Sequence, residues 1–189
     1  MKKMCRRILV CVLLAVCFWT GTFLADRKKF QEERIRFHVV AASDTVEDQK
    51  LKISVRDAVL KSMEAELAAL SDAKQAAQYL QEKIPSIQQI AEETLQKLGC
   101  TDSVTVTLKK ELFGKQSTNL FSLPAGLYQT LRVTIGQGMG QNWWGVVFSP
   151  AVPELQPVFE EEKENQTQSQ LGLMVRDVLD KLGNILFSQ

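Results

Sequence analysis

The sequence predicts an α+β protein: an N-terminal signal or anchor helix, one domain in which helices cover a mixed or antiparallel sheet of about four or five strands, and a C-terminal amphipathic helix. Three observations lead to this prediction. Residues 8–25 are uncharged, residues 45–98 repeat apolar side chains at helical spacing, and residues 104–148 contain several strand-like runs. With 45% hydrophobic and 24% charged residues, the composition suffices for about one globular domain.

The N-terminal segment, residues 1–25, has the order of an export signal. A basic start, MKKMCRR, precedes the apolar run ILVCVLLAVCFWTGTFLA at residues 8–25. As a helix this run spans about 27 Å, close to the ~30 Å hydrocarbon core of a bilayer. Cleavage after Ala25 would place Phe23 where a small residue is expected, so both a signal peptide and a retained membrane anchor stay open. We expect the N-terminus inside and the domain exported across, or anchored in, the cytoplasmic membrane.

The first part of the domain predicts a strand and a helix. Residues 26–34 are charged and are interpreted as a solvated linker or stalk. Residues 35–40, IRFHVV, are typical of a strand that enters a covered sheet. Asp44 and Glu47 resemble a capping box, so a helix is expected from Thr45 to about Leu70. Its apolar stripe is Leu51, Val55, Ala58, Val59 and Ser62.

Two further helices and a strand follow. Asp72 predicts a helix start, and that helix is expected to run to about Lys83. Pro85 predicts a boundary, and the next helix is expected to end at Leu98, before Gly99. Residues 104–108, VTVTL, alternate as a strand does. Residues 120–123 and 128–135 predict two more strands, separated by the turn Pro124-Ala125-Gly126.

The chain is organised around residues 131–150, LRVTIGQGMGQNWWGVVFSP. The pattern predicts a strand, a flexible loop with Gly136, Gly138 and Gly140, and a second strand that begins near Trp143. A phosphate-binding loop is not expected, because such a site needs a helix after the glycines. For Asn142, Trp143 and Trp144, core packing and contact with a partner both remain open, since tryptophan is favoured in cores and at binding hot spots.

The C-terminal part is divided by composition. The domain is expected to cover residues 35–158, followed by an acidic and amide-rich linker at 159–170. Residues 171–189 repeat apolar side chains at helical spacing. This amphipathic helix is expected to pack on its own domain or to dock into a partner.

Charge and residue usage exclude several function classes. The net charge is +1, and the remainder is mildly acidic once the basic start is removed, which argues against a nucleic-acid binder. Cys100 is the single cysteine beyond the N-terminal segment and His38 is the single histidine, so no metal site with recognisable spacing is present. We expect no cofactor and no small-molecule substrate.

His38 is the one residue that a Ser-His-Asp mechanism could use. Ser43, Asp44 and Asp48 follow it closely in sequence, at the end of the strand and the first turn of the helix. One interpretation is a structural strand histidine with helix-capping residues beside it. The alternative is an extracytoplasmic envelope hydrolase that uses His38 with Ser43 or Asp48.

Two segments together resemble the stage II sporulation protein R family: IRFHVVAASDTVEDQKLKISVRDAVL at residues 35–60 and LPAGLYQTLRVTIGQGMGQNWWGVVFSP at 123–150. The first is similar to the family pattern R-F-H-V-x-A-N-S-D with E-D-Q and K-x-x-V-R-D-A-V. The second is similar to Y-x-x-L-R-V-x-I-G-x-G-x-G-x-N-W-W. This chain departs at Ala42, where the family has asparagine, and at Gly145 and Val152, where it usually has cysteines. The paired loss is what the absence of one disulfide would look like.

The resemblance implies an exported signalling protein of endospore-forming bacteria, without catalysis of its own. It implies action in the space between forespore and mother cell, on a membrane-embedded aspartic protease that matures a mother-cell sigma factor precursor. The candidate contact residues follow from where the two motifs fall: His38, Ser43, Asp44, Gly136, Gly138, Gly140, Asn142, Trp143 and Trp144.

Overall fold

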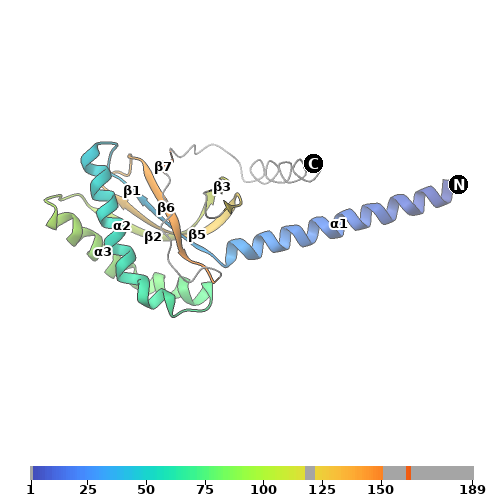
Figure 1. Cartoon of the computed structure of the whole chain (residues 1–189), viewed down its shortest axis with the longest axis horizontal. Coiled ribbons are helices and arrows are strands. Elements are labelled where there is room, and N and C mark those ends of the chain that lie inside the picture. Colours follow the sequence, from blue (N-terminus) through green and yellow to red (C-terminus); the bar gives the residue numbers. More distant parts are fainter. Residues whose placement is uncertain (1, 118–121, 151–160, 163–189) are drawn as a thin grey trace.

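The computed structural model describes residues 2–117, 122–150 and 161–162, and it confirms the predicted α+β class. A long helix, α1 (Lys2–Glu32), projects from a domain in which two further helices lie on one side of a sheet (Figure 1). The predicted C-terminal helix, most of the predicted polar linker and Val152 lie outside the described residues.

The sheet is mixed and has the strand order β2-β5-β1-β6-β7. β1 (Ile35–Val40) is parallel to β5 (Gly126–Ile135) and antiparallel to β6 (Asn142–Phe148), and β2 (Val104–Phe113) is antiparallel to β5. β7 (Glu161–Glu162) pairs with the start of β6. A separate two-stranded ribbon joins β3 (Gln116–Ser117) to β4 (Ser122–Leu123). β2 is longer than the predicted strand at 104–108, and it includes Lys109 to Phe113.

Helices α2 (Val46–Ala68) and α3 (Ala73–Lys97) cover one face of this sheet (Figure 1). All six residues of β1 are buried, because the central strand has neighbours on both edges and cover on both faces. Side chains alternate along a strand, so Phe37 and Val39 face the helices while Arg36 and His38 face the opposite side. The main core includes Phe37, Val39, Val55, Val59, Leu80, Ile87, Leu131, Val133 and Trp143.

The opposite face is organised around Arg36, which is fully buried. Its guanidinium carbon lies 3.6 Å from the Phe113 ring centroid and 4.7 Å from the Trp144 ring centroid. The same guanidinium donates a hydrogen bond to the side-chain amide oxygen of Gln116 on the ribbon. A cation between aromatic faces with a polar acceptor is a favourable way to bury charge. Arg36 therefore joins β1 to the β3–β4 ribbon.

The predicted boundary at Pro85 is wrong, because α3 is one helix with Pro85 inside it. Proline removes one backbone hydrogen bond from a helix interior and usually kinks or breaks it. Leu80 before it and Ile87 after it are both buried in the main core. Packing against the sheet on both sides of Pro85 therefore offsets the lost hydrogen bond. The predicted cap at Asp72 is present, since its carboxylate accepts from the Lys74 and Gln75 amides.

The predicted linker at residues 26–34 is instead the end of α1, which remains helical to Glu32. Two ion pairs at helical spacing, Lys28–Glu32 and Lys29–Glu33, each with a 3.8 Å nitrogen–oxygen distance, support the helix there. Over Leu9–Glu32, α1 is long enough and apolar enough to cross a membrane, and its apolar 18-residue window is not buried in the domain.

The last turns of α1 pack on the domain. Arg27 is buried and donates a hydrogen bond to the Ala125 carbonyl oxygen, and the Gln31 side-chain amide donates to the same oxygen at 3.3 Å. Phe30 packs beside Leu123 and Trp144. The carbonyl of the predicted turn at 124–126 thus serves as the attachment point for the helix. The sequence did not predict this contact, because Arg27 lies in a run of charged residues that is typical of a solvent-exposed segment.

Candidate functional site

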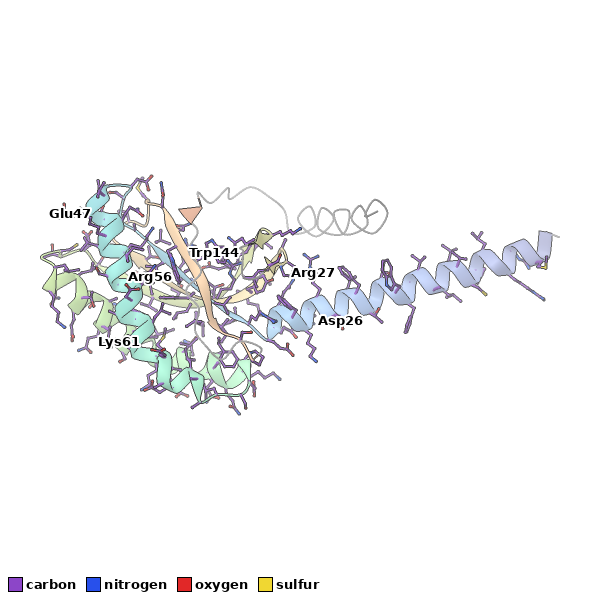
Figure 2. All side chains as sticks on the ribbon, viewed as in Figure 1. Asp26, Arg27, Glu47, Arg56, Lys61 and Trp144 are labelled. Atoms are coloured by element: carbon purple, nitrogen blue, oxygen red, sulfur yellow. The ribbon has the colours of Figure 1, made fainter. Side chains whose placement is uncertain are left out.

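The two segments that carry the family resemblance meet at one end of the sheet. β1 and β5 are parallel, with Val40 opposite Thr134, so the turn after β1 and the loop after β5 leave the sheet together. We call residues 41–45 the turn and residues 136–141 the glycine loop, and both together the loop–turn surface. Figure 2 shows Glu47, in the first turn of α2, at the end of the domain away from Arg27 of α1.

Backbone hydrogen bonds hold the glycine loop against the turn. The Met139 amide donates to the Ala42 carbonyl at 3.2 Å, and the Gly140 amide donates to the Ala41 carbonyl at 3.0 Å. At its other end the loop is held by the Gly136 amide, which donates to the Ser103 carbonyl at 2.8 Å. The sequence predicted a flexible loop, and in this structure contacts distant in sequence give it one defined backbone.

The three glycines serve two different purposes. Gly136 and Gly138 have φ angles of +55° and +63°, a region that side chains with a Cβ rarely adopt. Gly140 needs no unusual φ, but a Cβ at this position would overlap the backbone carbonyl of Ser43. The loop thus depends on Gly136 and Gly138 for its shape and on Gly140 for its close approach to the turn.

Asp44 also joins the turn to the glycine loop, and we call this set of contacts between the two segments the junction. Its Oδ1 accepts a hydrogen bond from the Gln141 amide at 2.6 Å. The expected capping role of Asp44 is wrong, because the N-cap of α2 is Thr45, whose hydroxyl accepts from the Asp48 amide at 3.2 Å. Threonine is among the residues preferred at an N-cap, and with Thr45 in that position Asp44 is available for the loop.

A buried lysine supports the junction from the helix side. Lys52 is fully buried, and its Nζ donates to Gln49 Oε1 at 2.5 Å and to the Gln141 carbonyl at 3.2 Å. Gln49 in turn donates from its Nε2 to the Ser43 carbonyl at 2.9 Å. Gln141 is therefore held on both sides, at its amide by Asp44 and at its carbonyl by Lys52. Together these contacts order the loop–turn surface before any partner arrives.

The candidate hydrolase residues are engaged in separate contacts. The Ser43 hydroxyl in the turn donates to the Asp48 carboxylate in the first turn of α2. His38 lies on the sheet face opposite the helices, with Nδ1 3.4 Å from Glu111 Oε2 and its ring edge against Phe113. Among the described contacts of His38, none is to Ser43 or Asp48, so a nucleophile and a base are not brought together.

Glu111 stands between His38 and Arg132, whose Nη1 lies 3.3 Å from Glu111 Oε1. Burial raises the pKa of the Glu111 carboxyl, but the hydrogen bond with His38 and the charge of Arg132 outweigh burial, so the pKa is lowered overall. The cluster joins β1, β5 and β2 across the sheet, and we interpret it as a structural network. Within residues 2–117, 122–150 and 161–162, no group of three or more His, Cys, Asp and Glu side chains could hold a metal ion.

The two tryptophans are buried on opposite faces, as neighbours in a strand must be. Trp143 packs on the helix side, with its ring centroid 5.7 Å from that of Phe37 and 5.1 Å from the guanidinium carbon of Arg56. Trp144 packs beside Arg36 on the other face. Each indole is 2% exposed, so in this structure the pair anchors β6 in the domain beneath the loop–turn surface.

Several residues of the site were missed from sequence. Gln49 and Lys52 lie among predicted helix residues, and their contacts depend on a loop far along the chain. A signal for Lys52 was present, because Lys52 and Arg56 are two cations at helical spacing beside the apolar stripe. Met139, at the tip of the glycine loop, is 81% exposed.

Comparison with known proteins decides the family. Residues 31–154 match the model of the family described as stage II sporulation protein R. The chain belongs to the stage II sporulation protein R family. Stage II sporulation protein R of Bacillus subtilis (strain 168) is 32% identical over 154 residues, which cover 79% of this chain and 69% of that protein. No solved structure matches the chain.

The stage II sporulation protein R match covers residues 31–154 and therefore includes the entire loop–turn surface, whereas Arg27 and Phe30 of the docked end of α1 precede it. Gly145 is a position where the resemblance led us to expect a cysteine. A Cβ at this position would lie 2.6 Å from Cη2 of Trp143, so the indole occupies the space that a side chain would need. In this member of the family, a cysteine at position 145 would require Trp143 to shift.

Proposed function

We propose that this chain is an exported signalling protein of sporulation that activates a membrane-embedded aspartic protease, which then matures a mother-cell sigma factor precursor. Family membership supports the role in sporulation. The exposed apolar helix α1 supports export or anchoring, by its length and composition. In this proposal the domain acts in the space between forespore and mother cell, as a ligand without catalysis.

The loop–turn surface is the observation that supports this proposal best. It is assembled from both segments that carry the family resemblance, and it lies at the end of the domain away from α1 (Figure 2). Its backbone is fixed by Asp44, Lys52 and the turn carbonyls. A surface that is ordered before binding loses less conformational entropy on binding, so it suits a recognition role.

Met139 gives this surface an apolar contact point. The side chain is 81% exposed although Gly138, Met139 and Gly140 all donate backbone hydrogen bonds. A single exposed methionine is ordinary on a protein surface, and here the backbone that carries it is hydrogen-bonded to the turn. Methionine adapts well to apolar partner surfaces because it is unbranched and polarizable.

The experiment is co-expression of the full chain with the cognate membrane-embedded protease and its sigma factor precursor. We expect precursor cleavage to depend on the chain. Met139→Asp is expected to reduce cleavage about tenfold or more, because a charge at an apolar contact must be desolvated. The matched control is Leu98→Asp, which places the same charge at a 53% exposed leucine outside the loop–turn surface.

Two outcomes would contradict the proposal. Precursor cleavage that is equal with and without the chain would exclude activation. Equal loss of cleavage in Met139→Asp and Leu98→Asp, with both variants folded by circular dichroism, would move the contact away from the loop–turn surface.

A further inference from the structure

The two edges of the main sheet differ in how they are protected. β2 forms one edge and carries three consecutive charged residues, Lys109, Lys110 and Glu111. Charged side chains on an edge strand discourage pairing with another chain. β6, with the sequence NWWGVVF, carries no charged residue at all. Without β7 it would be an uncharged and unprotected edge.

β7 covers this edge only in part. Its two residues pair with the first two residues of β6, Glu162 opposite Asn142 and Glu161 opposite Trp143. In the part of the chain that the structure describes, residues 144–148 have no strand partner on that side. A two-residue strand supplies few backbone hydrogen bonds, and glutamate is depleted in strands. The cover is therefore the shortest pairing in the main sheet.

We propose that β6 is an acceptor for an extended segment of the protein partner, which pairs antiparallel with β6 and displaces β7. This inference rests on the proposed function, in which the partner is the membrane-embedded protease. β7 itself shows that the edge accepts an antiparallel strand. In strand addition, backbone hydrogen bonds supply affinity and alternate side chains supply specificity.

The position of β6 supports this inference further. β6 begins at Asn142, immediately after Gln141, whose amide and carbonyl are both held by the junction. A strand added along β6 would therefore lie next to the loop–turn surface. Cross-strand neighbours on β6 are mostly apolar, since Val146, Val147 and Phe148 follow the tryptophans. The added segment is expected to be uncharged and rich in apolar residues.

The test uses the full chain in lipid vesicles, with and without the protease in the same vesicles. Glu161→Pro with Glu162→Pro removes two backbone donors and prevents β7 from pairing. Glu161→Gln with Glu162→Gln is the matched control, because it removes both charges and keeps both donors. The readouts are co-purification of the protease and amide hydrogen exchange of residues 144–148.

We expect the protease to slow exchange at least tenfold for those amides of residues 144–148 that point away from β1, in the wild-type chain and in the glutamine pair. The proline pair is expected to bind the protease more tightly, because no strand has to be displaced. Protease binding with unchanged exchange at residues 144–148 would overturn strand pairing and leave the proposed function intact. Weaker binding by the proline pair would also overturn it. If the proline pair formed dimers without binding the protease, the edge would belong to a second copy of the chain, and pairing with the protease would be overturned. If the wild-type chain failed to bind the protease, the proposed function itself would be contradicted.

Discussion

The carboxylate of Asp44 accepts a hydrogen bond from the amide of Gln141 at 2.6 Å, across 97 positions of sequence. This contact joins the turn after β1 to the glycine loop before β6. It explains why two motifs that are far apart along the chain form one surface. Ala42 takes part through its backbone carbonyl, which accepts from the Met139 amide, so this contact does not depend on the side chain at position 42.

Asp44→Ala is expected to loosen the glycine loop, because the Gln141 amide loses a charged acceptor. Hydrogen bonds to charged groups contribute about 1.5–3 kcal/mol, so exchange of the Gln141 amide should become at least tenfold faster. Nuclear magnetic resonance of the amide would measure this rate. Asp44→Asn keeps an acceptor oxygen and should show a smaller increase. An unchanged rate in Asp44→Ala would contradict the role given to this contact.

Gly140→Ala is expected to lower the free energy of unfolding by about 1–3 kcal/mol, the usual cost of overpacking. The added methyl group meets the Ser43 carbonyl, and a backbone atom cannot rotate away as a side chain can. Gly114→Ala is the matched control, since a Cβ there meets no atom within 4 Å. Urea denaturation of both variants would check this difference. Equal stability would show that the loop shifts at little cost.

Lys52→Met is expected to destabilise the domain by about 1–3 kcal/mol, the cost of leaving buried polar groups without a partner. The methionine keeps most of the apolar stem, but the Gln141 carbonyl and the Gln49 side chain lose the donor at Nζ. Lys61→Met, at an exposed position of the same helix, should change stability little. Chemical denaturation that ranks Lys61→Met as the more damaging change would refute this prediction.

The effect of Glu111→Gln is expected to depend on pH. The pKa of Glu111 is lowered from its ordinary value of 4.5 in the folded chain, so the folded state favours the charged carboxylate. The resulting stability is fully present above that ordinary value and is lost as the pH falls through the folded pKa. Unfolding measured from pH 7 down to pH 3 should therefore show a cost of Glu111→Gln that shrinks toward the acid end.

A control separates this linkage from a general effect of charge. Glu64 is exposed on α2, and Glu64→Gln should give a much flatter difference from the wild-type chain over the same range. If the stability difference between Glu111→Gln and the wild-type chain stayed constant from pH 7 to pH 3, the substitution would act through packing. The destabilisation would then not come from loss of the carboxylate's charge beside His38 and Arg132.

The periodicity of the sequence was sufficient to predict those helices and strands whose patterns extend over only a few neighbouring residues. The alternation of β1 and β5, the helical spacing of α2 and the cap at Asp72 all depend on neighbours a few residues away. The sequence therefore predicted the α+β class, the apolar N-terminal helix and the position of the glycine loop. The two motifs were also sufficient for the family, which the match over residues 31–154 confirms.

Only the tertiary structure decided what those elements do. Pro85 stays inside a helix because Leu80 and Ile87 pack into the same core on either side of it. Arg27 becomes buried because the Ala125 carbonyl, far along the chain, accepts its hydrogen bond. The glycine loop is fixed because β1 and β5 run parallel and bring their ends together. Contacts of this kind depend on distance in space, and a pattern of neighbouring residues carries no information about it.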